Sequence, residues 1–267
     1  MSTIMALIRC DFFSEVLGLS TSMTVILPQA TRAQIGMTGA APAGPPPVLY
    51  LLHGLTDDAT IWMRRTSIER YVADLGLAVV MPQVDRSFYV DERYGNRYGS
   101  FLTEELPELV GHFFRVSSRR EDTFVAGLSM GGYGAMRWAL TRPTRFAAAA
   151  SLSGVLDLAS QQGEDHRDDL YPRIFGDEPI AGGEFDLLAL LHRAGAHDVH
   201  LPDLYVCCGT DDALFAGNET FRDEAARAGV PLTYDTGAGA HDWAYWDAKI
   251  RDVLAWLPVR AHDVKNQ

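Results

Sequence analysis

The chain has 267 residues, of which 47% are hydrophobic and 22% are charged, and its 23 basic and 35 acidic residues give a net charge of -12. This composition is typical of an ordinary globular protein, and it excludes collagen-like, coiled-coil and mostly disordered chains. A surface this acidic repels phosphate backbones and anionic lipids, so we expect no nucleic-acid partner and no membrane partner. The expected partner is a small-molecule substrate, and a homo-oligomer is left open.

No apolar run approaches the roughly 20 residues that cross a bilayer. Arg9 and Asp11 interrupt the apolar stretch 1–13, which also lacks the basic start of a signal peptide. The three cysteines form no disulfide framework and have no zinc-ligand spacing; they are Cys10, Cys207 and Cys208. We therefore expect a cytoplasmic protein, with no metal.

In chain order, the predicted elements begin with two strands at 6–19 and 22–27 and an exposed Gly-, Ala- and Pro-rich turn at 36–47. Further strands are predicted at 48–52, 78–81, 123–126, 146–152, 204–208 and 232–235. Helices are predicted at 61–75, 100–114, 132–140 and 243–257. Strands that alternate with helices predict an α/β fold, in which a mostly parallel central sheet has helices on both faces.

The segment 156–200 breaks this alternation. It has no strong buried-strand pattern, it predicts a short helix at 185–193, and it contains an acidic cluster of Glu164, Asp165, Asp168 and Asp169. We interpret it as a small cap inserted into a single domain that spans 1–267 and lying over one edge of the sheet. A solvated surface excursion is the equally weighted alternative.

The pentapeptide Gly127-Leu128-Ser129-Met130-Gly131 matches G-x-S-x-G between a predicted strand and a predicted helix. A sharp strand-to-helix turn leaves no space for a Cβ beside the serine, which explains the flanking glycines. Ser129 would also lie at a helix N-terminus, where the helix dipole favours developing negative charge. The pattern predicts Ser129 as a nucleophile.

A serine nucleophile needs a base, and the base needs an acid to orient it. In an α/β-hydrolase the acid and then the histidine follow the serine along the chain. Asp211 and Asp212 follow one predicted strand, and His241 lies between the last predicted strand and the last predicted helix. We favour Asp212 over Asp211 because it lies further into the loop and is followed by the apolar run 213–215.

The loop after the strand at 48–52 is the expected second half of an oxyanion hole. The predicted donors are the backbone N–H groups of Leu55 and Met130, and His53 precedes the nucleophile, which favours a structural role for it. Large aromatic residues are candidate walls of a substrate pocket, although such residues more often lie in a core. The tentative substrate-binding residues are Trp62, Tyr89 and Trp243.

Five segments together resemble one known family: LLHGLTDDATIW (51–62), TEELP (103–107), AGLSMGGYGAM (126–136), CGTDD (208–212) and GAHDWAYW (239–246). They are similar to the esterase D-like serine esterases, closest to the bacterial tributyrin esterase and acetyl esterase branch. The resemblance implies an α/β-hydrolase fold and hydrolysis of short-chain acyl esters without a cofactor. It also implies Ser129 as nucleophile, Asp212 as acid and His241 as base, with oxyanion donors at Leu55 and Met130.

The predicted enzyme is a serine carboxylesterase with a Ser-His-Asp triad and an acyl-enzyme intermediate. An S-formylglutathione hydrolase-type thioesterase is the alternative, although that branch usually has histidine before the nucleophile, where this chain has Leu128. A non-catalytic binding protein on the same fold is a third possibility, because a fold alone does not imply activity. The acidic 156–200 segment further predicts a preference for neutral or cationic esters.

Overall fold

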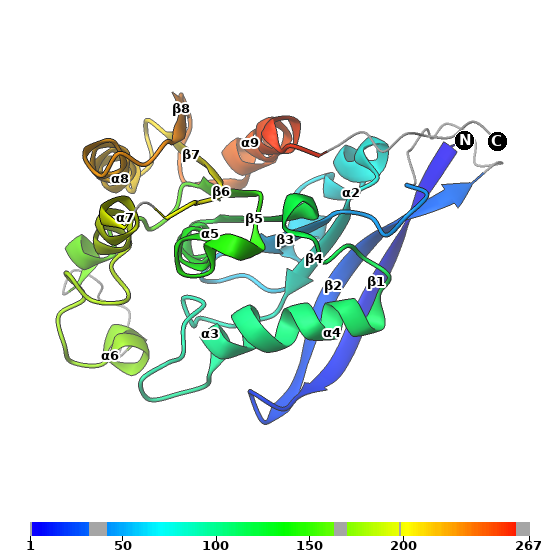
Figure 1. The fold of residues 1–267 in the computed structure, drawn as a ribbon, viewed down its shortest axis with the longest axis horizontal. Helices are drawn as coiled ribbons and strands as arrows, with labels where there is room; N and C mark the ends of the chain where they lie inside the picture. Colours follow the sequence, from blue (N-terminus) through cyan, green and yellow to red (C-terminus); the bar gives the residue numbers. More distant parts are fainter. Residues whose placement is uncertain (1, 32–41, 163–169, 198, 260–267) are drawn as a thin grey trace.

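The computed structural model describes residues 2–31, 42–162, 170–197 and 199–259, and it builds an eight-stranded sheet between layers of helices (Figure 1). The strands are β1 (Ser2–Ser14), β2 (Leu19–Thr31), β3 (Val48–Leu52), β4 (Ala78–Pro82), β5 (Thr123–Leu128), β6 (Ala148–Leu152), β7 (Asp203–Gly209) and β8 (Thr233–Gly237). Their order across the sheet is β1-β2-β4-β3-β5-β6-β7-β8. The first two pairings, β1 with β2 and β2 with β4, are antiparallel, and the other strands are parallel. The predicted mostly parallel sheet is confirmed.

The α-helices of the described residues are α1 (Ile61–Arg65), α2 (Ile68–Val72), α3 (Tyr98–Ser100), α4 (Leu106–Phe113), α5 (Met130–Thr141), α6 (Leu170–Phe175), α7 (Leu187–Ala196), α8 (Phe215–Arg227) and α9 (Trp243–Trp256). Helices α1, α2 and α9 contribute to the core on one face of the sheet, and α4, α5, α7 and α8 contribute to the core on the other. In the described ranges, no helix is both long enough and apolar enough to span a membrane.

Strand β3 shows why the sheet is covered on both faces. Its five residues are all buried, and successive side chains point to opposite faces. Tyr50 and Leu52 pack into the core beneath α4 and α5, whereas Leu49 and Leu51 pack into the core beneath α1, α2 and α9. An unbroken apolar run is what a strand buried on two sides requires.

The two N-terminal strands form a hairpin, in which β1 lies nearer the N-terminus than predicted and β2 is longer than predicted. The predicted strand at 6–19 ends at Ser14, because the chain turns there and Gly18, with a φ of 67°, donates its N–H to the Ser14 carbonyl at 2.9 Å. Strand β2 then starts at Leu19 and not at Ser22. Of the predicted turn at 36–47, residues 36–41 lie outside the described residues.

The predicted helix at 61–75 is broken into α1, α2 and the 3-10 turn η1 (Ala73–Leu75). The break lies at Thr66, whose backbone is extended. Its hydroxyl donates to the Trp62 carbonyl at 2.6 Å and accepts the Ile68 N–H at 3.1 Å, so one side chain ends α1 and starts α2. Such local side-chain bonds compete with helix propagation.

The predicted helix at 100–114 begins two residues earlier, at α3, and continues through a π-helical segment η2 (Phe101–Glu105) into α4. Pro107 explains the irregular hydrogen bonding, because it has no N–H to give to the preceding turn. The Glu105 carboxylate accepts the Glu15 N–H at 2.8 Å and bonds the Ser14 hydroxyl, which ties this helix to the β1–β2 turn.

Helix α8 was not predicted from the sequence. Only Asn218, Phe221 and Ala225 of its thirteen residues are buried, so its apolar stripe is narrow and interrupted by a polar side chain. Outside the N-terminal hairpin, the other predicted boundaries are within about three residues of those observed, and the largest difference is the end of α7 at Ala196. Helix α5 ends at Thr141, two residues before Pro143.

The described part of the 156–200 segment contains the 3-10 turn η5 (Ala159–Gln161) and helices α6 and α7, and it adds no strand to the sheet. Helix α7 starts two residues later than predicted, because Asp186 caps it by accepting the Leu188 and Ala189 N–H groups. The acidic cluster Glu164, Asp165, Asp168 and Asp169 lies outside the described residues.

Candidate active site

Ser129 lies on a strained turn between β5 and α5. Its φ is 52°, a left-handed value that is rare for a residue with a side chain. The flanking glycines permit the turn through close backbone contacts. A Cβ on Gly127 would lie 2.3 Å from the Gly131 carbonyl oxygen, and a Cβ on Gly131 would lie 2.5 Å from the Leu52 carbonyl oxygen. Both contacts are impossible for a larger residue, so the G-x-S-x-G pattern follows from packing.

Ser129, His241 and Asp212 form a hydrogen-bonded relay beyond the carboxyl ends of the parallel strands. Ser129 Oγ lies 3.1 Å from His241 Nε2, and His241 Nδ1 lies 2.9 Å from Asp212 Oδ2 and 3.1 Å from Oδ1. Because an ionised carboxylate only accepts hydrogen bonds, the imidazole proton belongs on Nδ1, which leaves Nε2 free to accept the serine proton. The structure thus brings together the three residues that the sequence predicted as a triad.

The acid and the histidine are brought together by contact between two loops. A Cβ on Gly209 would lie 2.2 Å from the Gly239 carbonyl oxygen, so the end of β7 touches the loop after β8. The Thr210 N–H donates to the Gly237 carbonyl at 2.9 Å, and the Asp211 N–H donates to the Gly239 carbonyl at 3.0 Å. Asp211 therefore contributes its backbone to this contact and exposes its side chain, whereas Asp212 turns its side chain inward.

The environment of Asp212 favours its ionised form. Burial alone would raise the pKa of this carboxyl, but hydrogen bonds from the His241 ring and the Leu214 N–H outweigh burial and lower the pKa below its usual value. The Leu214 N–H lies 2.8 Å from Asp212 Oδ1. The Asp212 side chain is fully buried, whereas 35% of the His241 side chain is exposed, so the histidine is the accessible member of the pair.

A row of perpendicular rings supports His241. The Trp246 ring meets the His241 ring edge-on, with centroids 4.9 Å apart. Trp246 in turn meets Trp243 at 5.2 Å, and Trp243 meets Trp62 at 5.3 Å, each pair close to perpendicular. Edge-to-face contacts of this kind fix ring orientation, so they hold the imidazole in the plane in which it meets Ser129.

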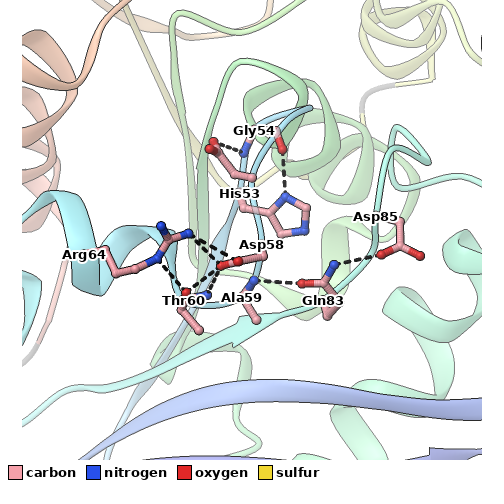
Figure 2. A network of polar contacts seen from close by, with 9 residues as sticks. His53, Gly54, Asp58, Ala59, Thr60, Arg64, Gln83 and Asp85 are labelled. Carbon is pink, nitrogen blue, oxygen red and sulfur yellow. Dashed lines mark hydrogen bonds and ion pairs between the residues drawn. The ribbon is translucent and has the colours of Figure 1, made fainter.

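His53 shapes the loop that follows β3 (Figure 2). Its Nδ1 lies 2.8 Å from the Gly54 carbonyl, and its Nε2 accepts the Val84 N–H at 3.3 Å. Burial lowers the pKa of this imidazole, so it is neutral and carries its proton on Nδ1. His53 takes no part in the relay with Ser129, which agrees with the structural role that its position in the chain predicts.

A second set of polar contacts fixes the rest of this loop (Figure 2). Asp58 accepts the Thr60 N–H at 2.8 Å and pairs with the Arg64 guanidinium at 3.2 Å. The Ala59 N–H donates to the Gln83 Oε1 at 2.9 Å, and the Gln83 amide donates to Asp85 at 2.8 Å. The loop after β3 is thereby tied to the loop after β4, which limits its movement beside Ser129.

The backbone N–H groups of Leu55 and Met130 have no hydrogen-bond acceptor within the part of the chain that the structure describes. Met130 is the first residue of α5, where a helix leaves its N–H groups unpaired. Leu55 follows Gly54, whose close contact with the Asp57 carboxylate and the Leu128 side chain leaves no space for a Cβ. Both residues border the cavity that contains Ser129.

A cavity of about 610 Å³ opens over the relay. Its lining is Gly54, Leu55, Thr56, Asp57, Phe88, Leu128, Ser129, Met130, Val155, Gln161, Tyr171, Ala213, Leu214, His241, Asp242, Trp243 and Trp246. Trp243 is the one tentative substrate-binding residue in that lining. Trp62 and Tyr89 are outside it, with 1% of each residue exposed, because Trp62 donates to the Leu52 carbonyl and Tyr89 donates to the His53 carbonyl.

Phe88, a neighbouring member of the same group of candidate pocket aromatics, lines the cavity, whereas Tyr89 does not. Both residues have left-handed φ values, 51° and 59°, so the backbone does not follow the alternation of an extended strand. Phe88 also packs edge-on against Tyr171, which the 156–200 segment contributes to the cavity wall. The placement of Tyr171 has no local sequence signal, since it depends on loops that meet only in the fold.

The carboxyl and imidazole side chains that line the cavity are those of Asp57, Asp242 and His241, and no lysine or arginine of the described ranges lines it. Burial raises the pKa of Asp57. Asp242 accepts the Tyr245 N–H at 3.0 Å and so caps α9. Across these same ranges, no group of three or more His, Cys, Asp or Glu side chains is arranged to hold a metal ion.

The model of the Esterase family matches residues 14–257 of this chain. The chain belongs to the Esterase family. It is 30% identical over 262 residues to the acetyl esterase of Caldicellulosiruptor saccharolyticus, a match that covers 95% of this chain and 98% of that relative. The resemblance that the five sequence segments carry is thereby confirmed at the level of the family.

Two solved structures from Staphylococcus aureus are similar to this chain. One is substrate-bound FphF, a fluorophosphonate-binding serine hydrolase, with a TM-score of 0.86. The other is the S-formylglutathione hydrolase FrmB as apoenzyme, with a TM-score of 0.83. Each is 38% identical and covers 95% of this chain and 98% of its own. The fold is the α/β-hydrolase fold, and this member of the Esterase family is a carboxylic ester hydrolase.

Proposed function

We propose that this esterase hydrolyses short-chain acyl esters through a Ser129–His241–Asp212 triad and an acyl-enzyme intermediate. The observation that carries the proposal is the unbroken relay from Ser129 Oγ through His241 to Asp212, which ends in a cavity large enough for a small ester. Nucleophile, base and orienting acid within hydrogen-bond reach of one another are the mark of nucleophilic acyl transfer.

In the first step, His241 Nε2 takes the hydroxyl proton of Ser129 while Oγ attacks the ester carbonyl. The C–O bond to the alcohol then breaks, and His241 returns the proton to the leaving alkoxide. Asp212 stays ionised and stabilises the imidazolium through Nδ1–H. The lowered pKa of Asp212 suits this role, because an acid that took up the proton could not hold the histidine in that tautomer.

The tetrahedral intermediate carries its negative charge on the former carbonyl oxygen. We assign its stabilisation to the N–H groups of Leu55 and Met130, which border the cavity beside Ser129 and have no acceptor in the described structure. A donor fixed before the reaction needs no reorganisation, and removal of one such donor costs about 3 kcal/mol in the barrier. Water then attacks the acyl-enzyme, with His241 as base, and releases the acid.

The cavity supports a small substrate. Its volume of about 610 Å³ must contain both the acyl and the alcohol groups, and its walls include Phe88, Val155, Leu214 and Trp243. The acetyl esterase relative supports the same acyl size. We further propose that segment 156–200 acts as a cap within a single domain, since it places Gln161 and Tyr171 in the cavity wall.

We propose a preference for neutral or cationic esters, because Asp57 and Asp242 border the cavity without a basic neighbour in its described lining. The expected result is a lower kcat/KM for a succinyl monoester than for the matched butyryl ester, with a gap that narrows as salt is added. Equal kcat/KM values for the two esters at low ionic strength would contradict this preference.

The function is tested with a fluorophosphonate probe and with p-nitrophenyl acetate. We expect the probe to label Ser129, as located by peptide mass spectrometry, and we expect Ser129→Ala to lose both labelling and turnover while its circular dichroism stays unchanged. Ser118→Ala is the matched control, since Ser118 is exposed and outside the cavity lining. A folded Ser129→Ala variant with full turnover would overturn the proposal, and an unlabelled, inactive wild type would favour a binding protein.

Thioester hydrolysis is the second candidate, because one of the two structures that are 38% identical to this chain is an S-formylglutathione hydrolase. Ser129 Oγ, activated by the same relay, could attack either an ester or a thioester carbonyl, so the triad does not discriminate between the two substrate classes. Leu128 stands before the nucleophile and touches the oxyanion loop at Gly54. A higher kcat/KM for S-formylglutathione than for short alkyl acetates would decide in favour of the thioesterase.

A further inference from the structure

Among the residues that the structure describes, no strand pairs with the outer edge of β1. It is the first strand in the sheet order, and its pairing with β2 runs from Ser2 opposite Thr31 to Ser14 opposite Leu19 without a bulge (Figure 1). The strand contains no proline and no lysine. Edge strands are usually protected by such features or by being short, because a free row of backbone N–H and C=O groups is a template for another strand.

The side chains on one face of β1 are exposed, and apolar and charged types follow one another along it in a distinct order. Leu7, Arg9, Asp11 and Phe13 alternate with partly buried residues, and Leu7 and Phe13 are 52% and 55% exposed. Arg9 and Asp11 form an exposed ion pair at 3.3 Å between these two apolar side chains. On the opposite face, Ile8, Cys10 and Phe12 pack against the core. Along the exposed face the side chains are therefore apolar, basic, acidic and apolar in turn. When two copies of this series run antiparallel, each basic residue faces an acidic residue and each apolar residue faces an apolar residue.

We propose that the outer edge of β1 pairs antiparallel with β1 of a second copy of the chain. The two copies are related by a two-fold axis that lies midway between their Cys10 residues, which we call the axis through Cys10. Such an axis, normal to the sheet, places residue 10 − n of one copy opposite residue 10 + n of the other. Arg9 then faces Asp11 of the second copy, and Leu7 faces Phe13 of the second copy, each contact occurring twice. Since Ser14 ends the strand, the paired stretch runs from Ala6 to Ser14.

Charge complementarity selects this register over its neighbours. An axis through Arg9 would place two arginines directly opposite each other, and an axis through Asp11 would do the same with two aspartates, which is destabilising. An axis at position 8 would place Arg9 opposite Leu7 and Asp11 opposite Met5. An axis at position 12 would place Asp11 opposite Phe13 and leave Arg9 outside the paired stretch, because β1 ends at Ser14. The axis through Cys10 alone pairs every charge of this face with its opposite.

The pairing would join two eight-stranded sheets edge to edge and leave both active sites open. Two strands, β2 and β4, separate β1 from β3, which carries the oxyanion loop at its carboxyl end, and β5 lies one strand further. The cavity over Ser129 includes no residue of β1 or β2. Dimerisation is therefore independent of the proposed chemistry, and variants of Arg9 and Asp11 should keep the wild-type kcat.

A charge swap tests the register, with light scattering after size-exclusion chromatography as the readout. The wild type should have about twice the chain mass of 29.4 kDa. Arg9→Asp and Asp11→Arg should each give the mass of one chain, because each places like charges opposite one another, and the double variant R9D/D11R should restore the dimer. Arg65→Asp is the control, since Arg65 is an exposed arginine on α1, away from the β1 edge.

Cysteine cross-linking tests the same axis by geometry. At this register the two Cys10 side chains are directly opposite, at the Cα separation of an antiparallel pair, about 4.5–5.5 Å, which a disulfide spans. Copper phenanthroline with oxygen should take two electrons and two protons from the two thiols and give a covalent dimer on a non-reducing gel. Cys10→Ser should abolish it, because Cys207 and Cys208 are buried.

A wild type with the mass of one chain at every concentration tested would overturn the proposal. A dimer that R9D leaves intact, or one that fails to cross-link through Cys10, would overturn the register. Loss of the dimer in both single variants, recovery in the double variant and cross-linking through Cys10 would support it.

Discussion

The serine and the histidine of the relay are held in place in different ways. Ser129 stands on a turn fixed by backbone packing, since neighbouring glycines touch the carbonyl oxygens of β3 and α5, and most of α5 is buried. His241 is partly exposed and is oriented by Asp212, which comes from another loop, and by the Trp246 ring. The nucleophile therefore depends on the integrity of the fold, whereas the base depends on a few side-chain contacts.

The largest effect should come from Asp212→Asn. The amide offers a donor where His241 needs an acceptor, so the imidazole loses the tautomer that takes the serine proton, and kcat should fall about 10³–10⁴-fold. The unfolding midpoint in urea should change little by comparison, because the change is isosteric. Asp211→Asn is the control, since the Asp211 side chain is exposed and only its backbone bonds the histidine loop. Equal losses in the two variants would contradict the assignment.

Gly131→Ala should destabilise the fold around Ser129. The added Cβ would lie 2.5 Å from the Leu52 carbonyl oxygen, a backbone atom that cannot move freely, so we expect a loss of about 2–4 kcal/mol in the free energy of unfolding. Gly217→Ala on α8 is the matched control, since the nearest atom to its Cβ is 3.4 Å away. That change should stabilise by about 0.5–1 kcal/mol, because alanine is the better helix former. Similar chemical unfolding curves for the two variants would contradict the packing account.

Trp246→Phe tests whether the Trp246 ring orients His241. The smaller ring weakens the edge-on contact with His241, so we expect kcat/KM for p-nitrophenyl acetate to fall about tenfold, near 1.4 kcal/mol, with the fold retained. Trp256→Phe is the control, because Trp256 is the last residue of α9, packs against Tyr205 of β7 and lies outside the cavity lining. If both tryptophan variants lose the same activity, the ring row does not orient the base.

The smallest effect concerns stability in acid. The pKa of Asp212 is lowered in the fold, so this carboxylate contributes stability above its unfolded pKa of about 3.9, and the contribution is lost as pH falls through the lower folded pKa. The difference in unfolding free energy between wild type and Asp212→Asn should therefore shrink as the pH is lowered from about 6 toward 3. If urea unfolding shows that the free-energy difference between the two proteins stays constant over this pH range, the proposed contribution of ionised Asp212 to stability is contradicted.

The same contrast explains what the sequence could predict. The elbow at Ser129 is local, because the glycines that permit the turn lie within the motif itself. The positions of Asp212 and His241 followed from chain order and from the rule that strand ends converge, and their contact depends on Gly209 and Gly239, which touch only after folding. The alternating strands and helices were predicted because a doubly covered sheet needs apolar runs of recognisable period.

What escaped prediction has no local signal. Helix α8 buries few residues, so its pattern is weak, and the break at Thr66 depends on one hydroxyl that bonds in two directions. Trp62 was a candidate pocket residue by proximity in sequence to the oxyanion loop, yet its indole N–H donates to the Leu52 carbonyl and its ring stays in the core. Tyr171 reaches the cavity from a segment more than 40 residues downstream of Ser129, a distance that no motif spans.

In the proposed mechanism, Ser129 carries the acyl group during turnover. The most direct measurement is peptide mass spectrometry of the enzyme quenched in acid during steady-state hydrolysis of p-nitrophenyl acetate. One acetyl group on the peptide that contains Ser129, absent from Ser129→Ala and present in Ser118→Ala, is the predicted result. Turnover with no acetylated Ser129 peptide, or with the acetyl group on another residue, would contradict it.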